Sequence, residues 1–394
     1  MSARPPVTDW STDFDHLDPR WVENPYPIWD ELREKCPVAH TERFRGVYFP
    51  SRYEDVRAVA YDTENFSSRR IIVRETPPPR IPAPPITSDP PEHRPAKNLL
   101  LPAFTPDAIK QHEQPTRDIC ARLIDRFAGK PGCDAAIDYA QEIPVRVIAV
   151  MLGLPESEGD RFRKWIHEIL EAGITRPDIL MKAMGETSAY FQAEIDKRKS
   201  EPRDDLITQL SRATIDGQPI TEDHLLGALR LILIAGIDTT WSAIGSCFWH
   251  LAQHPEDRRR LVNDPALIPT AVEEFLRAYA PVTMAREVIK DVEIGGCPFK
   301  TGEMVLLSFP AANRDPRMFP DADRVVIDRK ENRHAAFGLG IHRCIGSNLA
   351  RMEITVALQE WLKRIPEFHL DPAARVTWSE GTVRGPRKLP VLLG

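Results

Sequence analysis

The spacing of apolar residues predicts a chain that is mostly helical after residue 93. Apolar positions recur every three to four residues, which places them on one face of a helix. We expect helices over residues 93–128, 139–152, 156–173, 176–199, 204–212, 222–253, 255–262, 267–279 and 347–363. Prolines at positions 155, 202, 255 and 265 stand between these segments, where helices should stop.

Short β-type runs lie on either side of this helical block. They cover Val38–His40, Gly46–Phe49, Val292–Ile294 and Met304–Phe309, while Tyr26–Lys35 suits a helix and residues 311–343 read as loops. No repeat and no domain boundary is evident. The pattern predicts a mainly α protein with small β-sheets, a single large domain over residues 1–394 in which residues 1–20 form a loosely ordered N-terminal segment.

One long stretch has neither the apolar spacing of a helix nor the alternation of a strand. Residues 71–92 contain eight prolines, and proline removes backbone donors and stops helices. Loops of this length inside a compact chain are usually functional. A rigid linker between domains is the alternative.

Composition narrows the class of protein. The 52 Lys and Arg against 58 Asp and Glu give a net charge of −6, which offers no reason to expect a nucleic acid partner. The N-terminus has no apolar leader, and no stretch suggests a membrane span. We therefore expect a cytoplasmic protein, monomeric and without a membrane partner. The six cysteines are scattered, so each is first taken as a small buried apolar residue.

Cys344 has a different context. Residues 337–346 read Phe-Gly-Leu-Gly-Ile-His-Arg-Cys-Ile-Gly, directly ahead of a predicted helix. Glycines permit positive φ and the close approach of a flat ring, and a helix N-terminus stabilises a thiolate. One cysteine cannot build a tetrahedral zinc site, whereas a single axial thiolate suits a haem iron. A glycine-rich turn around a buried cysteine is the alternative.

The helix over residues 222–253 is locally weak at its centre. An apolar run ends in Ala235-Gly236-Ile237-Asp238-Thr239-Thr240. Gly costs a helix interior about 1 kcal/mol relative to Ala, and Asp and Thr compete with the backbone for hydrogen bonds. Such inconsistency is expected at functional sites. A capping cluster at a helix break is the alternative.

These two segments resemble motifs of the cytochrome P450 superfamily. The loop is similar to Phe-x-x-Gly-x-x-x-Cys-x-Gly, and the helix to Ala-Gly-x-Asp-Thr-Thr. The resemblance implies the P450 fold, a haem b cofactor with Cys344 as its iron ligand, and a cofactor loop that includes Phe337, Gly338 and Gly346. It also implies that Asp238 and Thr239 serve oxygen activation by delivering protons.

Further positions follow the family's order. Glu274 and Arg277 match its Glu-x-x-Arg pair, and Arg329 matches the arginine that joins them in a structural triad, although Val325 stands where an aromatic residue is usual. By the same resemblance, the haem propionates would be held by four cationic or imidazole side chains: His93, Lys97, Arg286 and His342.

The implied activity is that of a haem-thiolate monooxygenase, which inserts one atom of O2 into a small hydrophobic organic substrate by hydroxylation or oxidative dealkylation. Electrons would come from NAD(P)H through a ferredoxin reductase and an iron–sulfur ferredoxin. Lys97, Arg343 and Arg351 would form a basic patch for the ferredoxin. Alternatives are a peroxide-driven enzyme or isomerase, a non-catalytic haem-thiolate sensor, and a haem-free enzyme with Cys344 as nucleophile and His342 as base.

The substrate pocket is expected along the proline-rich loop and at Ile234, Ala235, Val282, Met284 and Val383, most of which are apolar. Arg230 is unusual, because a charge inside a helix beside an apolar run needs a partner. That partner is either a protein group or water, or else a substrate carboxylate, as on an aromatic acid, with Arg74 or Arg80 assisting.

Overall fold

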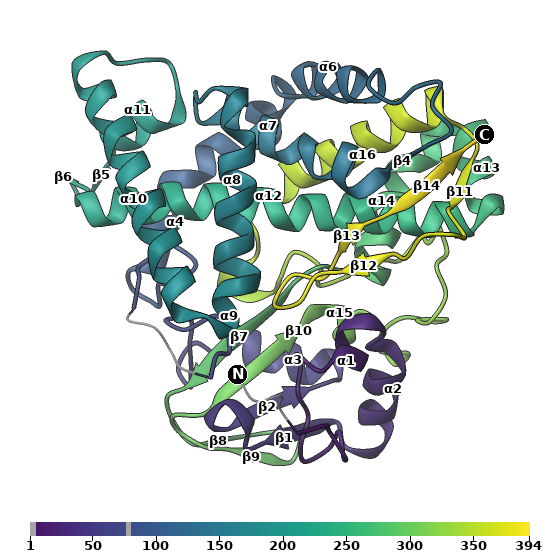
Figure 1. Ribbon diagram of the computed structural model, residues 1–394. Helices are drawn as coiled ribbons and strands as arrows, with labels where there is room; N and C mark the ends of the chain where they lie inside the picture. The colour runs from purple at the N-terminus through teal and green to yellow at the C-terminus, as the bar shows by residue number, and fades with distance from the viewer. Residues whose placement is uncertain (1–4, 76–79) are drawn as a thin grey trace.

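Helices form one side of the molecule and a five-stranded sheet the other in the computed structural model, which describes residues 5–75 and 80–394 (Figure 1). The helices are α1 (Pro19–Glu23), α2 (Tyr26–Lys35), α3 (Tyr53–Tyr61), α4 (His93–Leu100), α5 (Pro106–Lys110), α6 (Glu113–Ile124), α7 (Glu142–Met151), α8 (Gly159–His167), α9 (Gly173–Thr175), α10 (Pro177–Ser200), α11 (Leu206–Ser211), α12 (Glu222–Gln253), α13 (Pro255–Asn263), α14 (Ile268–Ala278), α15 (Phe309–Ala312) and α16 (Ser347–Arg364). A π-helical turn over Glu168–Ala172 continues α8.

The main sheet has the strand order β1-β2-β10-β7-β3. Strands β1 and β2 form an antiparallel hairpin, β10 lies parallel to β2, and β7 lies antiparallel to β10. The strands are β1 (Val38–Thr41), β2 (Val47–Pro50), β3 (Phe66–Ser67), β4 (Gly132–Asp134), β5 (Thr214–Ile215), β6 (Gln218–Pro219), β7 (Thr283–Val288), β8 (Val292–Ile294), β9 (Cys297–Phe299), β10 (Met304–Ser308), β11 (Phe368–Leu370), β12 (Thr377–Trp378), β13 (Pro386–Lys388) and β14 (Pro390–Leu393).

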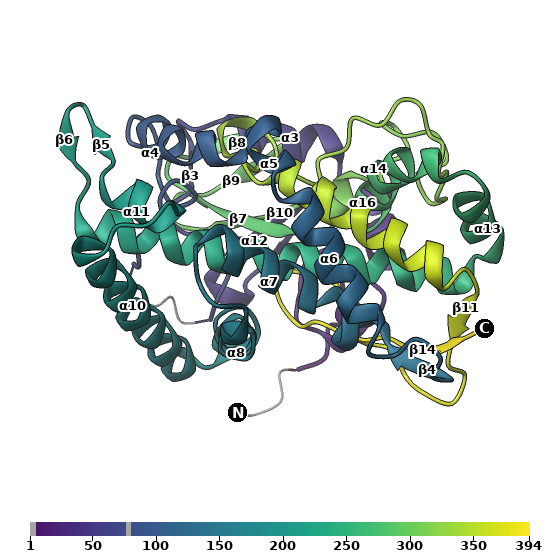
Figure 2. The same cartoon turned by 90° about the horizontal axis from the view of Figure 1, so that it is seen from above.

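Helix α12 is the central element, and it crosses the middle of the helical side (Figure 2). The Thr221 side chain caps its first turn through the His224 amide, and the helix ends before Pro255. Its length and hydropathy would let it cross a membrane, but 72% of that apolar window is buried inside the protein. It is therefore a core helix.

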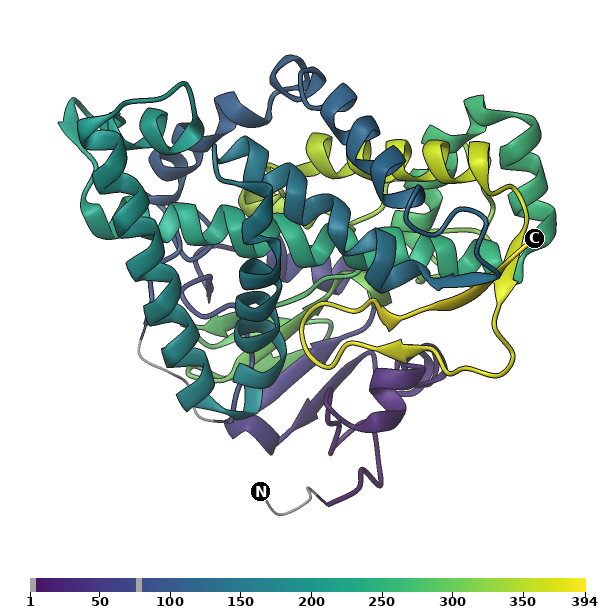
Figure 3. The same cartoon turned by 45° about the horizontal axis from the view of Figure 1, so that its top comes forward.

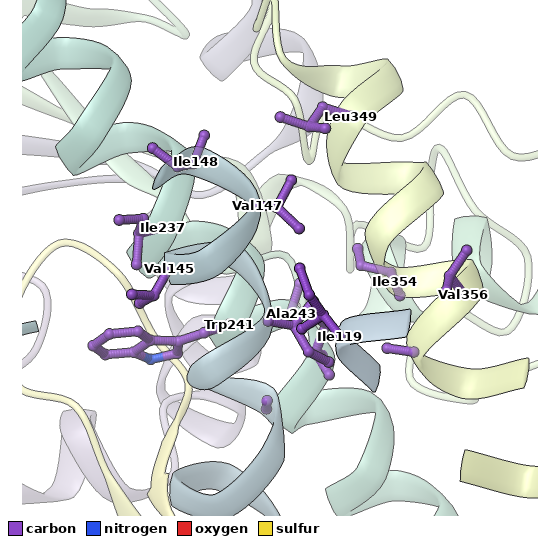
Figure 4. Close-up of a cluster of buried hydrophobic side chains, with 14 of the residues drawn as sticks. Ile119, Val145, Val147, Ile148, Ile237, Trp241, Ala243, Leu349, Ile354 and Val356 are labelled. Atoms are coloured by element: carbon purple, nitrogen blue, oxygen red, sulfur yellow. The ribbon is translucent and has the colours of Figure 1, made fainter. Parts of the chain in front are cut away.

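The largest hydrophobic core lies where α12 packs against α7 and α16. Figure 4 shows side chains from these helices and from α6 pointing toward one another, among them Val147, Ile237 and Ile354. Gly236 permits the close approach of α7, because a Cβ at this position would collide with the Ile148 side chain. The weak centre of α12 therefore lies where another helix packs closely against it.

Two expectations are corrected by the structure. The helix predicted over residues 93–128 is divided into α4, α5 and α6. Pro102 and Pro106 lie at the break between α4 and α5, and the break between α5 and α6 falls at Gln111 and His112. The N-terminal segment is not loose over residues 5–20, since Phe14 is fully buried against Trp21 and Phe49; residues 1–4 lie outside the described residues. So do residues 76–79 of the proline-rich loop, while its other residues form no helix or strand.

Candidate active site

A largely apolar cavity lies between α12, the Cys344 loop, β7, α4 and the proline-rich loop. Its wall brings together segments far apart in the chain, including Pro85, Ile86, His93, Lys97, Leu231, Ile232, Ala235, Gly236, Thr239, Val282, Met284, Arg286, Phe337, Gly338, His342, Cys344 and Gly346. Most residues of the two sequence motifs and all four predicted cationic or imidazole side chains therefore meet at one cavity.

The Cys344 loop is held by its backbone. The Cys344 amide donates to the Phe337 carbonyl at 2.8 Å, which closes the loop. Gly338 and Gly340 adopt φ values of +74° and +66°, the left-handed region that glycine favours. Gly346 has φ −79° and is the N-cap of α16. The glycines thus serve the turn at two positions and the helix start at the third.

Cys344 lines the cavity. Burial by the surrounding protein raises the pKa of this thiol, while a hydrogen bond from the Gly346 backbone and the cations of Lys97, Arg343 and Arg351 act in the opposite direction. Those groups favour the thiolate that a metal ligand requires. The described residues contain no group of three or more His, Cys, Asp or Glu that could hold a metal ion. A single thiolate is the kind of axial ligand that a haem iron takes.

Positive and imidazole groups gather on one side of the cavity. The His93 and His342 rings lie 4.4 Å apart, and the Nε2 atom of each is buried without a hydrogen-bond partner among the described residues. Arg286 is 5% exposed, and burial lowers its pKa to about 10. Burial, with the cation of Lys97, lowers the pKa of His93 to about 4. Unpaired donors of this kind fit an anionic ligand group such as a carboxylate.

Helix α12 is continuous where it borders the cavity, so the capping cluster at a helix break is ruled out. The Thr239 hydroxyl donates to the Ala235 carbonyl at 2.8 Å, one turn back, and Thr239 lines the cavity. A hydroxyl so placed can reorient toward a ligand while its helix stays intact.

Asp238 is not among the residues that line the cavity. Its carboxyl group is fully buried, and Oδ1 accepts from Arg387 on β13 at 2.8 Å. Burial raises the pKa of Asp238 to about 6, with Glu171 adding to the rise and Arg387 opposing it. Sequence reasoning missed Arg387, because nothing in its local context distinguishes it from any other basic residue near the C-terminus.

Known proteins resemble this chain in both sequence and structure. The family model for cytochrome P450 matches residues 160–376. The mycinamicin IV hydroxylase/epoxidase of Micromonospora griseorubida is 37% identical over 92% of this chain and 94% of its own. The chain belongs to the cytochrome P450 family. The vitamin D(3) 25-hydroxylase of Pseudonocardia autotrophica is 34% identical over 94% of both chains. The crystal structure of CYP109E1 from Bacillus megaterium with testosterone has a TM-score of 0.87 at 32% identity, over 94% of this chain and 97% of that one.

This P450 is accordingly a haem-thiolate monooxygenase with the P450 fold, as the sequence motifs predicted. The sensor and the haem-free nucleophile hypotheses fall with that assignment, because the family implies a haem-thiolate cofactor and relatives over most of the chain are named as hydroxylases.

The P450's Glu274 is fully buried and is the centre of a polar cluster. Arg277 donates to both of its carboxylate oxygens, at 2.8 and 2.9 Å, and Arg329 donates to Oε2 at 3.0 Å. The Val326 amide and the Asn332 side chain complete the set at 2.8 and 3.1 Å. Both predicted arginines of the triad therefore bind Glu274, and the aliphatic Val325 does not prevent it.

Only some predicted pocket residues of the P450 line the cavity. Ala235, Val282 and Met284 do, as do Pro85 and Ile86 of the proline-rich loop, while Arg230, Ile234 and Val383 do not. Ile234 packs against the core, and Val383 pairs with Val282 in an isolated bridge behind the wall.

Arg230 has protein partners, which corrects the idea that it awaits a substrate carboxylate. It donates to the Ser188 hydroxyl at 2.7 Å and to the Pro82 carbonyl at 3.2 Å. Arg74 is also buried and donates to the carbonyls of Ile169 and Gly173. These guanidinium groups connect the proline-rich loop to neighbouring helices and do not point at the cavity. Arg80 is exposed and lines a different pocket, outside the cavity wall.

The predicted basic patch is partly neutralised. Arg351 makes two hydrogen bonds to Glu273, at 2.6 and 2.9 Å, and lies over the Phe337 ring. The Lys97 ammonium donates to the carbonyls of Ile341 and Arg343 at 2.5 and 2.9 Å. Of the three cations, only Arg343 is exposed.

Proposed function

We propose that this P450 inserts one atom of O2 into a small, uncharged, hydrophobic organic molecule, by hydroxylation or oxidative dealkylation. Its cofactor would be haem b, and its electrons would come from NAD(P)H through a ferredoxin reductase and a ferredoxin in the cytoplasm. The observation that carries the proposal is that Cys344 and Thr239 belong to the wall of one apolar cavity.

Each residue of the site would have a role that follows from its position in the cavity. Haem, when bound, supplies the redox chemistry that activates oxygen. Cys344 would hold the iron, and the unpaired imidazoles of His93 and His342, with the Arg286 cation, would hold the propionates. Thr239 would present its Oγ1 hydroxyl to the reacting ligand, and Asp238 would hold the proton that passes toward it. The apolar wall excludes water, which strengthens each of these polar interactions.

An uncharged substrate is favoured by the lining. Apart from the hydroxyls of Thr239 and Thr240, the wall contributed by α12 and the proline-rich loop is apolar, and the nearby buried arginines Arg74 and Arg230 already bind protein carbonyls. A carboxylate placed there would lose its hydration without gaining a cation. The relatives named for mycinamicin IV and vitamin D(3), and the neighbour solved with testosterone, support an organic substrate.

A ferredoxin would approach the cysteine side of the haem. Arg343 is the exposed cation at this face, and an acidic partner would be attracted to it. Because Arg351 and Lys97 are already engaged, we expect Arg343→Glu to slow ferredoxin-driven reduction more than Arg351→Glu, and to weaken its dependence on ionic strength.

Carbon monoxide difference spectra test the proposed function. The reduced wild-type protein should show the Soret shift of a thiolate-ligated haem, and Cys344→Ala should abolish it. Cys36→Ala, a half-buried cysteine outside the cavity wall, is the matched control and should keep it. An unchanged spectrum in Cys344→Ala would overturn the proposal.

Ferric spin-state titration with paired neutral and carboxylate analogues tests the substrate class. Neutral members should give the larger response, and a response confined to acids would contradict it. Turnover with peroxide exceeding turnover with ferredoxin would instead favour the peroxide-driven alternative.

A further inference from the structure

A line of charged side chains runs from the surface to Asp238. His167 at the end of α8 is 63% exposed, and its Nδ1 lies 3.8 Å from Glu171 in the π-helical turn. Glu171 accepts from the Nε of Arg387 at 2.7 Å, and Arg387 in turn donates to Asp238 at 2.8 Å. Side-chain exposure falls from 63% at His167 to 14% at Glu171, 16% at Arg387 and 0% at Asp238.

The backbone fixes Arg387 in this place. Figure 3 shows the yellow C-terminal strands passing between the helices and the purple N-terminal part of the chain. Here the segment before β13 lies against α12 so closely that a Cβ at Gly385 would collide with Ser242. The Arg387 guanidinium also donates to the Ser242 hydroxyl at 3.0 Å and lies 4.7 Å from the Trp241 ring. It is therefore held from several sides.

The two oxygens of Asp238 are not equivalent. Oδ1 accepts from Arg387, whereas Oδ2 is buried and has no hydrogen-bond partner within the described residues. A carboxyl group held in this way can bind or release a proton at Oδ2 without rotating, because its other oxygen is fixed by the arginine.

We propose that Arg387 is a positioning residue for the monooxygenase reaction: it fixes Oδ1 of Asp238 and leaves Oδ2 as the atom that exchanges the proton, while Glu171 competes for the same guanidinium and so tunes how tightly that proton is held. This inference rests on the proposed role of Asp238. A proton taken up at Oδ2 from water is released from Oδ2 toward the cavity, so the carboxyl group is unchanged after each cycle.

The two partners act on Asp238 in opposite directions. Burial is the main cause that raises its pKa; the Arg387 cation lowers the pKa, the Glu171 anion raises it, and protonated His167 lowers it. Replacing Arg387 should therefore raise the pKa of Asp238, and replacing Glu171 should lower it. An opposite charge within about 4–6 Å changes a carboxyl pKa by roughly 1–3 units, so a shift of about one unit or more is expected for Arg387, which bonds directly to Asp238. For Glu171, which binds the other side of the Arg387 guanidinium, only the direction is expected.

Infrared difference spectroscopy measures this directly in the haem-loaded ferric protein. The band of the protonated carboxyl group that is missing in Asp238→Asn belongs to Asp238, and its titration in wild type should have a midpoint near pH 6. Arg387→Met should move the midpoint up and Glu171→Gln should move it down. Arg387→Lys, which keeps the charge but loses the planar fork, should restore part of the shift. Arg375→Met, whose side chain is 78% exposed and pairs with Glu23, should leave it unchanged.

Turnover gives the second readout. Arg387→Met should lose at least tenfold in turnover number and increase the solvent isotope effect, with the binding of substrate, read from the spin state, little changed. Midpoints that move in the same direction in both variants, or do not move, would overturn the proposal and leave Arg387 a structural ion pair. A variant that keeps the carbon monoxide Soret band but fails this test refutes only the inference, whereas loss of that band in wild type would refute the proposed function itself.

Discussion

Glu274→Gln is expected to be one of the most destabilising conservative substitutions in this P450. The Glu274 carboxylate is fully buried and accepts five hydrogen bonds, two of them from Arg277, which is itself fully buried. Glutamine keeps the size but removes the charge, and its amide group faces donors. Breaking a buried ion pair by removing one partner costs about 3–5 kcal/mol, a large part of the roughly 5–15 kcal/mol that stabilises a typical protein.

Denaturant unfolding of the haem-loaded protein, followed by circular dichroism, measures this loss, and the carbon monoxide spectrum reports the fraction that still binds haem through a thiolate. Glu31→Gln is the matched control, because Glu31 forms an exposed ion pair with Lys35 on α2; it should unfold like wild type within error. If Glu274→Gln were as stable as Glu31→Gln, our reading of the buried cluster would be refuted.

Three further changes test other parts of the structure. Gly340→Ala should lower the free energy of unfolding by about 1–3 kcal/mol, because φ is +66° and the new Cβ would meet the Ala60 carbonyl; a neutral result in denaturant unfolding would contradict this. Arg230→Met should leave the ratio of affinities for acidic and neutral ligands unchanged in spin-state titrations, since its partners are protein groups; selective loss of acids would revive the carboxylate hypothesis. Burial alone would raise the pKa of Glu273, but hydrogen bonds from a neighbouring histidine and arginine hold it at about 2. Its contribution to stability is therefore present above about pH 4.5 and lost as the pH falls toward 2, and Glu273→Gln should flatten acid unfolding in that window.

Local signals were sufficient for the elements that have clear ends. The helix predicted over residues 222–253 has the same bounds in the structure, where Thr221 caps it and Pro255 follows it. The helix Tyr26–Lys35 also matches. Where the apolar period continued across a break, as between residues 93 and 128, the sequence prediction joined three helices into one. Periodicity does not detect such breaks, and Pro102 and Pro106 mark only the one between α4 and α5.

Strand β7 shows a different limit. Thr283–Val288 was not predicted as a separate strand, because it lacks simple alternation between buried and exposed positions. It is a strand because β10 pairs with it along five residues and β3 covers its other edge. Such a strand is defined by its neighbours, and it matters here because it carries Met284 and Arg286 into the cavity.

Some residues of the candidate site could be predicted from the local sequence, whereas others depend on contacts between distant parts of the chain. The motifs identify Cys344 and Thr239 because their chemistry depends on nearby glycines and on one turn of helix. They say nothing about which charges become paired, since a buried ionisable group takes whatever partner the fold brings to it. Asp238 accepts a hydrogen bond from Arg387, which is 149 residues away in the chain. Arg351 donates to Glu273. Arg230 donates to a backbone carbonyl, although a substrate carboxylate was one of its predicted partners. Predictions about the reaction type depend on motif residues such as Cys344 and Thr239, and the structure left them unchanged. Predictions about proton supply, substrate charge and partner docking depend on how buried charges are paired, and these are the predictions that the structure changed.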